Sequence, residues 1–261
     1  MTPAVIVFDL NGTLLDTEAL APAIRRIFGR KLPVDTWFTK VLLYSMATSL
    51  AGDYRPFGEL AMAVLEMSAA GKGVQLREAD IAKVKSGMKQ LPPFPEVKKA
   101  LRRLREAGFR LAVLTNSAKA SLEEQLHHAG LAEYFEQAFS VDTVRRYKPA
   151  RDTYRAAAYL LGVDLHAVLM VAAHPWDLLG ATRAGCRTAF LARPGKALFP
   201  DAPVPDYTAG NLQELADRLM AANGLRVEPE TGHTGRWLAV TGCGVAVGAM
   251  GSALARRLYK S

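Results

Sequence analysis

The chain has 261 residues, of which 50% are hydrophobic and 22% are charged, and these proportions exclude a disordered or fibrous protein. The net charge is +8, but the basic residues are scattered in short runs such as Arg102–Arg105, which argues against a nucleic-acid surface. The two cysteines, Cys186 and Cys243, are too far apart for a disulfide framework or a metal-ligand spacing.

The N-terminal apolar run, Ala4–Phe8, is a predicted strand rather than a leader. It is too short for a signal peptide and is interrupted by Asp9, so we expect a reduced, cytoplasmic protein. Its β-branched residues indicate a strand buried on both faces of a parallel sheet, followed by a turn at Gly12.

Short buried strands alternate with helices of about ten residues after Pro95. In chain order, the predicted elements are the helix Val97–Ala107, strand Arg110–Leu114, helix Ala118–Ala129, strand Ala138–Val141, helix Arg151–Leu161, strand Val168–Ala172, helix Trp176–Ala184 and strand Thr188–Leu191. This alternation predicts right-handed βαβ units and an α/β fold with a doubly wound, Rossmann-like parallel sheet.

The segment 16–90 breaks this rhythm, because it shows helical periodicity without a convincing strand. Its predicted helices are Ala23–Phe28, Thr36–Ala51, Phe57–Ala70 and Glu78–Met88, and the proline-rich stretch Leu91–Pro95 closes it. We therefore expect an α/β core made of residues 1–15 and 91–223, with residues 16–90 inserted as a helical cap.

The C-terminal tail, residues 224–261, differs in composition from the rest of the chain. Its segment Trp237–Ala255 is uncharged and long enough to span a bilayer, but its many small residues make the hydropathy weak. Two interpretations stay open: a weak membrane tether, and a loosely ordered or surface-packed tail.

Polar motifs follow the predicted strands, at the sheet edge where doubly wound folds bind ligands. Asp9 ends the first strand, and Thr115–Ser117 end the next one along the sheet. Lys148 lies between Tyr147 and Pro149 before a helix, and Asp177 lies near the start of another. A carboxylate nucleophile, a lysine, a hydroxyl and amide pair, and a second carboxylate suit covalent catalysis.

The four motifs occur in one order: D-x-x-G-T-L from Asp9, L-T-N-S from Leu114, Y-K-P from Tyr147, and W-D at Trp176. Together they resemble the haloacid dehalogenase superfamily, and most closely its type II group, the L-2-haloacid dehalogenases, over residues 4 to about 222. The resemblance implies a hydrolase that cleaves the carbon–halogen bond of a small 2-haloacid through an aspartyl ester on Asp9, with no cofactor.

The resemblance also implies roles for individual residues. The implied catalytic residues are Asp9, Thr13, Lys148, Asp177 and His174, where Asp177 and His174 position water. The implied substrate-binding residues are Leu10, Asn11, Phe38, Lys40, Thr115, Asn116, Tyr154 and Trp176. Simpler roles compete with several of these assignments: helix capping for Asp177, Thr115 and Asn116, packing for Tyr154, and a structural histidine at position 174.

Four positions depart from the type II pattern. Asn11 stands where phosphatases have an aspartate and the type II enzymes have an aromatic residue. Phe38 stands where the dehalogenases have a cap arginine, and Lys40 is the cation that could replace it electrostatically, without the planar fork. Ala172 and His174 replace a serine and an asparagine. We therefore expect an altered halide pocket.

Two other functions remain as alternatives. One is a Mg²⁺-dependent phosphatase that would hold the metal with Asp9, the carbonyl of Asn11 and Asp177. The other is a binding or membrane-tethered protein that has lost turnover. The expected partner is a small organic acid and no nucleic acid; weak membrane association through the tail and a homodimer are further expectations.

Overall fold

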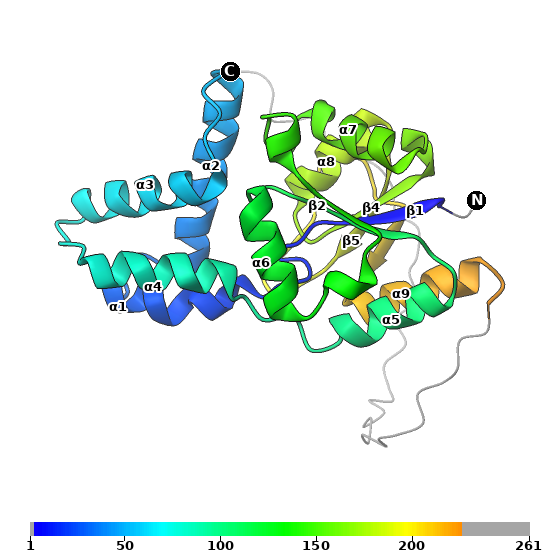
Figure 1. The fold of residues 1–261 in the computed structure, drawn as a ribbon, viewed down its shortest axis with the longest axis horizontal. Coiled ribbons are helices and arrows are strands. Elements are labelled where there is room, and N and C mark those ends of the chain that lie inside the picture. Colours follow the sequence, from blue (N-terminus) through cyan, green and yellow to red (C-terminus); the bar gives the residue numbers. More distant parts are fainter. Residues whose placement is uncertain (1–2, 226–261) are drawn as a thin grey trace, which may run out of the picture. The chain divides into compact units, whose positions relative to one another are not determined.

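Six parallel strands form the centre of the protein (Figure 1). In this computed structural model, which describes residues 3–225, the strands are β1 Val5–Phe8, β2 Leu111–Thr115, β3 Gln137–Ser140, β4 Val168–Ala172, β5 Arg187–Leu191 and β6 Tyr207–Ala209. Their order, β3-β2-β1-β4-β5-β6, places the first strand in the middle, and the chain winds outward from it in both directions. The predicted doubly wound α/β fold is confirmed.

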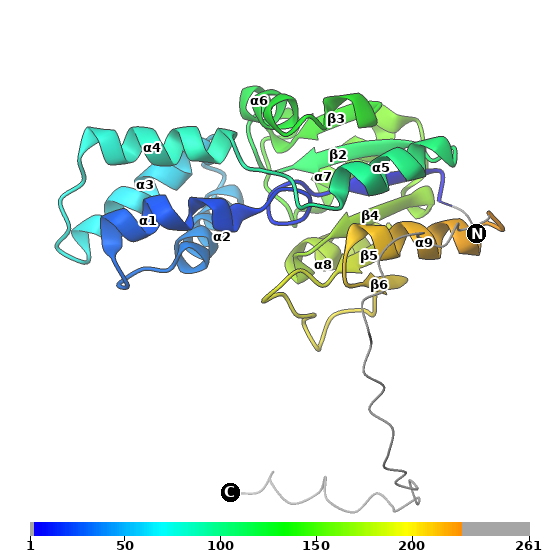
Figure 2. The ribbon, with the colours of Figure 1, turned by 90° about the horizontal axis from the view of Figure 1, so that it is seen from below.

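Helices cover both faces of the sheet (Figure 2). They are α5 Val97–Glu106, α6 Lys119–Ala129, α7 Arg151–Leu161, α8 Pro175–Ala184 and α9 Leu212–Ala222. Ile6 and Phe8 pack in the same apolar cluster as residues of α5, α6 and α9, whereas Val5 and Val7 pack with α7 and α8. Alternate residues of β1 thus point to opposite faces of the sheet. Both faces are buried under helices, which explains why every residue of β1 is apolar.

Four further helices lie between β1 and α5: α1 Ala21–Phe28, α2 Val34–Leu50, α3 Phe57–Ala70 and α4 Glu78–Lys89. Figures 1 and 2 show them grouped beside the α/β layers. Short 3-10 helices complete the described elements: η1 Thr17–Leu20, η2 Ala132–Tyr134, η3 Val141–Thr143 and η4 Leu165–Ala167. No strand interrupts the predicted helical segment, although its treatment as a separate cap domain stays a prediction.

Two adjacent chain segments join the four helices to the sheet. The N–H of Asp16 donates to the carbonyl of Pro92 over 2.8 Å, and the N–H of Phe94 donates to the carbonyl of Leu14 over 3.0 Å. The outgoing and returning segments are therefore tied together immediately after the loop that carries Asp9.

Sequence analysis did not assign β6 and α9. β6 has three residues, too few to show a periodic pattern, whereas α9 has a recognisable start in Asn211, whose side chain accepts a hydrogen bond from the N–H of Glu214. The tail segment Trp237–Ala255 lies outside the described residues. Among residues 3–225, no helix combines the length and the apolar character needed to cross a membrane.

Candidate active site

The loop after β1 fixes the carboxylate of Asp9 at the carboxyl edge of the sheet. The N–H of Asp9 donates to the carbonyl of Val171 over 3.0 Å, which extends the β1–β4 pairing by one residue. The chain then turns at Gly12, whose φ of 77° suits glycine, and a Cβ there would lie 2.9 Å from Nε2 of His174. Glycine at position 12 thus permits both the turn and the approach of His174.

Lys148 lies between two carboxylates and is completely buried. Its Nζ donates to Oδ1 of Asp9 over 2.7 Å, to Oδ2 of Asp177 over 2.6 Å and to the carbonyl of Leu114 over 2.9 Å. All three ammonium protons are therefore used. The structure brings together residues that are 139 and 29 positions apart in the chain.

The three charges shift one another's ionisation. Burial raises the pKa of Asp9, but the charges of Lys148 and His174 outweigh it and hold this pKa below its usual value. Burial lowers the pKa of Lys148, yet Asp177 and Asp9 raise it overall. For Asp177, burial and the neighbouring Asp9 raise the pKa against the opposing effect of Lys148. Asp9 is thus held ionised as a nucleophile, while Asp177 is the carboxylate better suited to accept a proton.

Thr13 fixes the second oxygen of Asp9. Its Oγ1 donates to Oδ2 of Asp9 over 2.6 Å and accepts from the N–H of Ala173 over 3.0 Å. With Lys148 on Oδ1, both carboxylate oxygens are held, so the side chain has a single orientation. This arrangement brings the predicted residues Asp9, Thr13, Lys148 and Asp177 into direct contact.

Tyr154, expected at the substrate, lies behind Asp177 instead. Its hydroxyl is 2.6 Å from Oδ1 of Asp177 and 3.0 Å from the carbonyl oxygen of the same residue, and its side chain is buried. Gly180 allows this approach, because a Cβ there would lie 2.7 Å from the Tyr154 hydroxyl and 2.6 Å from Pro149. The substrate-binding prediction for Tyr154 is corrected: it contacts Asp177 as a positioning residue.

Unused hydrogen-bond donors surround the nucleophile. The backbone N–H groups of Leu10, Asn11 and Asn116 have no hydrogen-bond partner within residues 3–225. In the same part of the chain, Nδ2 of Asn116 is buried without a partner, whereas its Oδ1 accepts from the N–H of Lys148 over 3.1 Å. Buried donors without partners are costly unless a ligand satisfies them, so this region is suited to bind an anionic group.

Thr115 and Leu10 are two further residues that were predicted to bind the substrate. Oγ1 of Thr115 accepts from the N–H of Ser117 over 3.1 Å, as expected for a turn, and its hydroxyl proton remains available. Leu10 is fully buried, backbone and side chain together. Substrate binding by Leu10 stays a prediction.

His174 lies beside the nucleophile, but its Nε2 proton points to the carbonyl oxygen of Asn11. Its Nε2 is 2.9 Å from the carbonyl oxygen of Asn11 and 3.7 Å from Oδ2 of Asp9, and its ring stacks on Trp176. Because a carbonyl oxygen only accepts, Nε2 carries the proton in this contact. Water activation by His174 would need its other nitrogen, Nδ1, and that role stays a prediction.

Phe38 and Trp176 line a cavity of about 810 Å³ beside Gly12 and His174. The ring of Phe38 packs edge-on against Phe57, with centroids 6.0 Å apart. Lys40, the expected substitute cation, is not among the residues that line this cavity. Two residues along an α-helix rotate a side chain by about 200°, so Lys40 points away from the face that carries Phe38. Substrate binding by Lys40 stays a prediction.

Sequence analysis missed two polar residues that support the loop after β1. Arg193, past the end of β5, donates from Nε to the carbonyl of Thr13 over 3.0 Å and from Nη1 to Glu96 over 2.6 Å. Gln125 donates to Oδ1 of Asn11 over 3.2 Å. A polar residue at a buried helical position was the available signal for Gln125; nothing local marked Arg193.

The oxygen atoms with which a phosphatase would bind Mg²⁺ already accept hydrogen bonds in this structure. Lys148 occupies Oδ1 of Asp9 and Oδ2 of Asp177, and His174 donates to the carbonyl oxygen of Asn11. A cation placed among these three groups would have to displace an ammonium that makes three hydrogen bonds. This donor set therefore fits Lys148 and does not fit a metal ion.

Comparison with known proteins gives consistent matches. A family model described as haloacid dehalogenase-like hydrolase matches residues 3–185. Haloacetate dehalogenase H-2 of Moraxella sp. (strain B) is 32% identical, covering 78% of this chain and 92% of that protein. The (S)-2-haloacid dehalogenase of Pseudomonas sp. (strain YL) is 31% identical, and the match covers 84% of this chain and 95% of that protein. A similar solved structure is the L-2-haloacid dehalogenase from Xanthobacter autotrophicus with chloropropionic acid covalently bound. Its TM-score is 0.77 at 27% identity, and the match covers 87% of this chain and 100% of that chain.

The contact between Tyr154 and Asp177 leads to a pH-dependent prediction. The Tyr154 hydrogen bond lowers the pKa of Asp177, so Tyr154→Phe should raise that pKa further. If Asp177 is a base, it acts ionised, and the acidic decline of kcat should move to higher pH. Loss of the bond should also cost about 1 kcal/mol of stability.

The matched control is Tyr159→Phe on the same helix, where the side chain is 84% exposed. It should leave both the pH profile and the unfolding midpoint unchanged. An unshifted acidic limb in Tyr154→Phe would show that Asp177 is not the group titrating in catalysis.

Proposed function

This chain belongs to the haloacid dehalogenase-like hydrolases, and from that premise we propose that it hydrolyses the carbon–halogen bond of a small (S)-2-haloacid through an ester on Asp9. The observation that carries the proposal is the position of Lys148, held 2.7 Å from Asp9 and 2.6 Å from Asp177. An ammonium there keeps the nucleophile ionised and fixed.

In the first step Asp9 attacks Cα of the substrate from the side opposite the halogen. A carbon–oxygen bond forms as the carbon–halogen bond breaks, and the halide leaves with the electron pair. The substrate carboxylate is bound by the donors without partners, the N–H groups of Leu10, Asn11 and Asn116 and the side-chain amide of Asn116. A halide leaves without a proton, so Asn11 need not supply the acid that a phosphatase aspartate supplies.

In the second step water attacks the carbonyl carbon of the Asp9 ester. Asp177 takes the proton from water, which its raised pKa favours, and passes it on as the 2-hydroxyacid leaves. The ester's bond between oxygen and the carbonyl carbon breaks, so one oxygen of water remains on Asp9. Because Cα is attacked only once, its configuration is inverted.

Several supporting residues hold this geometry without reacting. Thr13 and Lys148 orient Asp9, and Tyr154 orients Asp177. His174 donates to the carbonyl of Asn11 and thereby holds the loop that presents the free N–H groups. The mechanism uses no metal; a homodimer and a membrane tether remain predictions independent of it.

A release assay tests the proposal. The full chain, incubated with (S)-2-chloropropanoate and chloroacetate, should release halide equally well with and without EDTA. It should release no phosphate from a panel of small phosphate esters in Mg²⁺. Chelator-sensitive phosphate release without halide release would instead favour the phosphatase, and inactivity in both assays with tight binding of an organic acid would favour a binding protein.

Replacing Phe38 tests the altered halide pocket. Phe38→Arg should raise kcat/KM for (S)-2-chloropropanoate by about tenfold or more, because a guanidinium stabilises the charge of the leaving halide. The substitution loses the contact with Phe57, at a cost of about 1 kcal/mol.

Thr36→Arg is the matched control, since it adds the same charge two residues earlier on the same helix, at an exposed position that is not among the residues lining the cavity. It should leave kcat/KM unchanged. Equal gains in the two variants would show a general charge effect, and a loss in Phe38→Arg would show that the Phe38 ring itself contributes to the site.

A further inference from the structure

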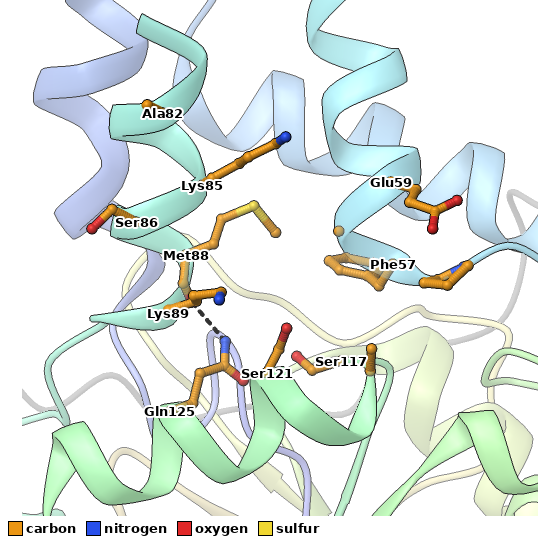
Figure 3. A pocket seen from close by; sticks show the side chains of 13 residues that line it. Phe57, Glu59, Ala82, Lys85, Ser86, Met88, Lys89, Ser117, Ser121 and Gln125 are labelled. Carbon is orange, nitrogen blue, oxygen red and sulfur yellow. Dashed lines mark hydrogen bonds between the residues drawn. The ribbon is translucent and has the colours of Figure 1, made fainter. Parts of the chain in front are cut away.

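A second cavity lies between α3, α4 and the start of α6 (Figure 3). Its volume is about 620 Å³, and Phe57, Lys85, Ser121 and Gln125 are among its lining residues. Pockets of about 300–1,000 Å³ hold ligands far larger than an acid of two or three carbon atoms. The cavity thus offers more space than the simplest 2-haloacids would use.

Hydrogen bonds join the floor of this cavity to the nucleophile loop. Ser117 and Gln125 both line the cavity. Nδ2 of Asn11 donates to the Ser117 hydroxyl over 2.9 Å, and Oδ1 of Asn11 accepts from Nε2 of Gln125 over 3.2 Å. Asn11 is two residues after Asp9, so two residues of the cavity lining are hydrogen-bonded to the loop that carries the nucleophile.

The cavity floor has an acceptor that nothing satisfies within residues 3–225. Both amide protons of Gln125 are used, by Oδ1 of Asn11 and by the carbonyl of Met88 at 2.7 Å, which fixes the orientation of the amide. Its Oε1 has no hydrogen-bond partner, although Gln125 is only 2% exposed. Figure 3 shows this amide at the base of the cavity, beside Ser121.

The other polar groups around the cavity are mixed and balanced in charge. Lys85 and Glu59 lie on facing walls, on α4 and α3 (Figure 3), and neither makes an ion pair in the part of the chain that the structure describes. Lys89 is paired with Glu124 at 2.9 Å. A cavity with one free cation, one free anion, hydroxyls and an unsatisfied acceptor suits an uncharged group that both donates and accepts hydrogen bonds.

We propose that this cavity receives the substrate chain beyond Cα, and that the enzyme prefers 2-haloacids whose chain ends in a carboxamide over those whose chain is apolar. The inference rests on the proposed function. A carboxamide donates to Oε1 of Gln125 and accepts from the hydroxyls of Ser117 and Ser121. Satisfying a buried acceptor in this way discriminates against an apolar chain of the same shape.

Two acids with the same heavy-atom skeleton test the preference. They are (S)-2-bromo-5-amino-5-oxopentanoate and (S)-2-bromo-5-methylhexanoate, which differ by an amide against an isopropyl group. The full chain should favour the amide by about tenfold in kcat/KM. Gln125→Met should lower that ratio about fivefold or more, whereas Gln213→Met, at another glutamine with an unpaired oxygen but on α9, should not change it.

Filling the cavity gives a second test. Ser121→Trp should lower the ratio of kcat/KM for the amide acid to that for chloroacetate by about tenfold or more, because the indole occupies the space for the longer chain. Thr36→Trp adds the same side chain at an exposed position of α2 that lines neither cavity, and it should leave this ratio unchanged. Equal turnover of the two bromoacids, or an unchanged ratio in Ser121→Trp, overturns the inference.

Binding of the halogen-free acids separates this inference from the proposed function. Calorimetry with 5-amino-5-oxopentanoate and 5-methylhexanoate should show about tenfold tighter binding of the amide, lost in Ser121→Trp. If no haloacid releases halide but this binding difference holds, the proposed function fails and the cavity assignment stands. If halide is released but the two acids bind equally, the cavity assignment fails alone.

Discussion

One buried ammonium group determines the arrangement of the site. Lys148 is fully buried between Asp9 and Asp177, two carboxylates that would repel each other without it. Removing one partner from a buried charge network costs about 3–5 kcal/mol, so loss of the lysine should destabilise this part of the fold. The same contacts assign different tasks to the two acids, since Asp9 is kept ionised and Asp177 is the better proton acceptor.

The sheet makes that network geometrically feasible. Asp9 continues the pairing of β1 with β4, and the carbonyl of Leu114 on β2 receives the third proton of Lys148, so three adjacent strands determine where the ammonium lies. Close packing then holds the second carboxylate, because Gly180 lets Tyr154 reach Asp177. Positions that the sequence shows only as glycines thus control the distances on which the chemistry depends.

The order of strands and helices and the residues at the strand ends were predictable, because buried strands, helix-ending glycines and polar motifs leave local patterns. Helix α7 and strand β4 match their predicted bounds end to end. Side-chain direction was not predictable: Tyr154 and Lys40 point away from their expected contacts, and Arg193 joins segments distant in the chain. Such contacts depend on tertiary packing, which no local pattern encodes.

The residues Asn11, Phe38 and His174, which depart from the type II pattern, were visible in the sequence, but their contacts were not. Asn11 is hydrogen-bonded to two residues that line a polar cavity, and His174 donates its Nε2 proton to the Asn11 carbonyl.

In the proposed reaction, Asp9 forms and then loses an ester bond to the substrate. A single turnover in heavy-oxygen water, with enzyme in excess over (S)-2-chloropropanoate, tests it most directly by mass spectrometry of the peptide that contains Asp9. One heavy oxygen should appear in Asp9 and none in the 2-hydroxyacid, because water attacks the ester carbonyl. Asp9→Asn should form no 2-hydroxyacid and release no halide. Heavy oxygen in the hydroxyacid with an unlabelled Asp9 would rule out the ester, since water would then have attacked Cα directly.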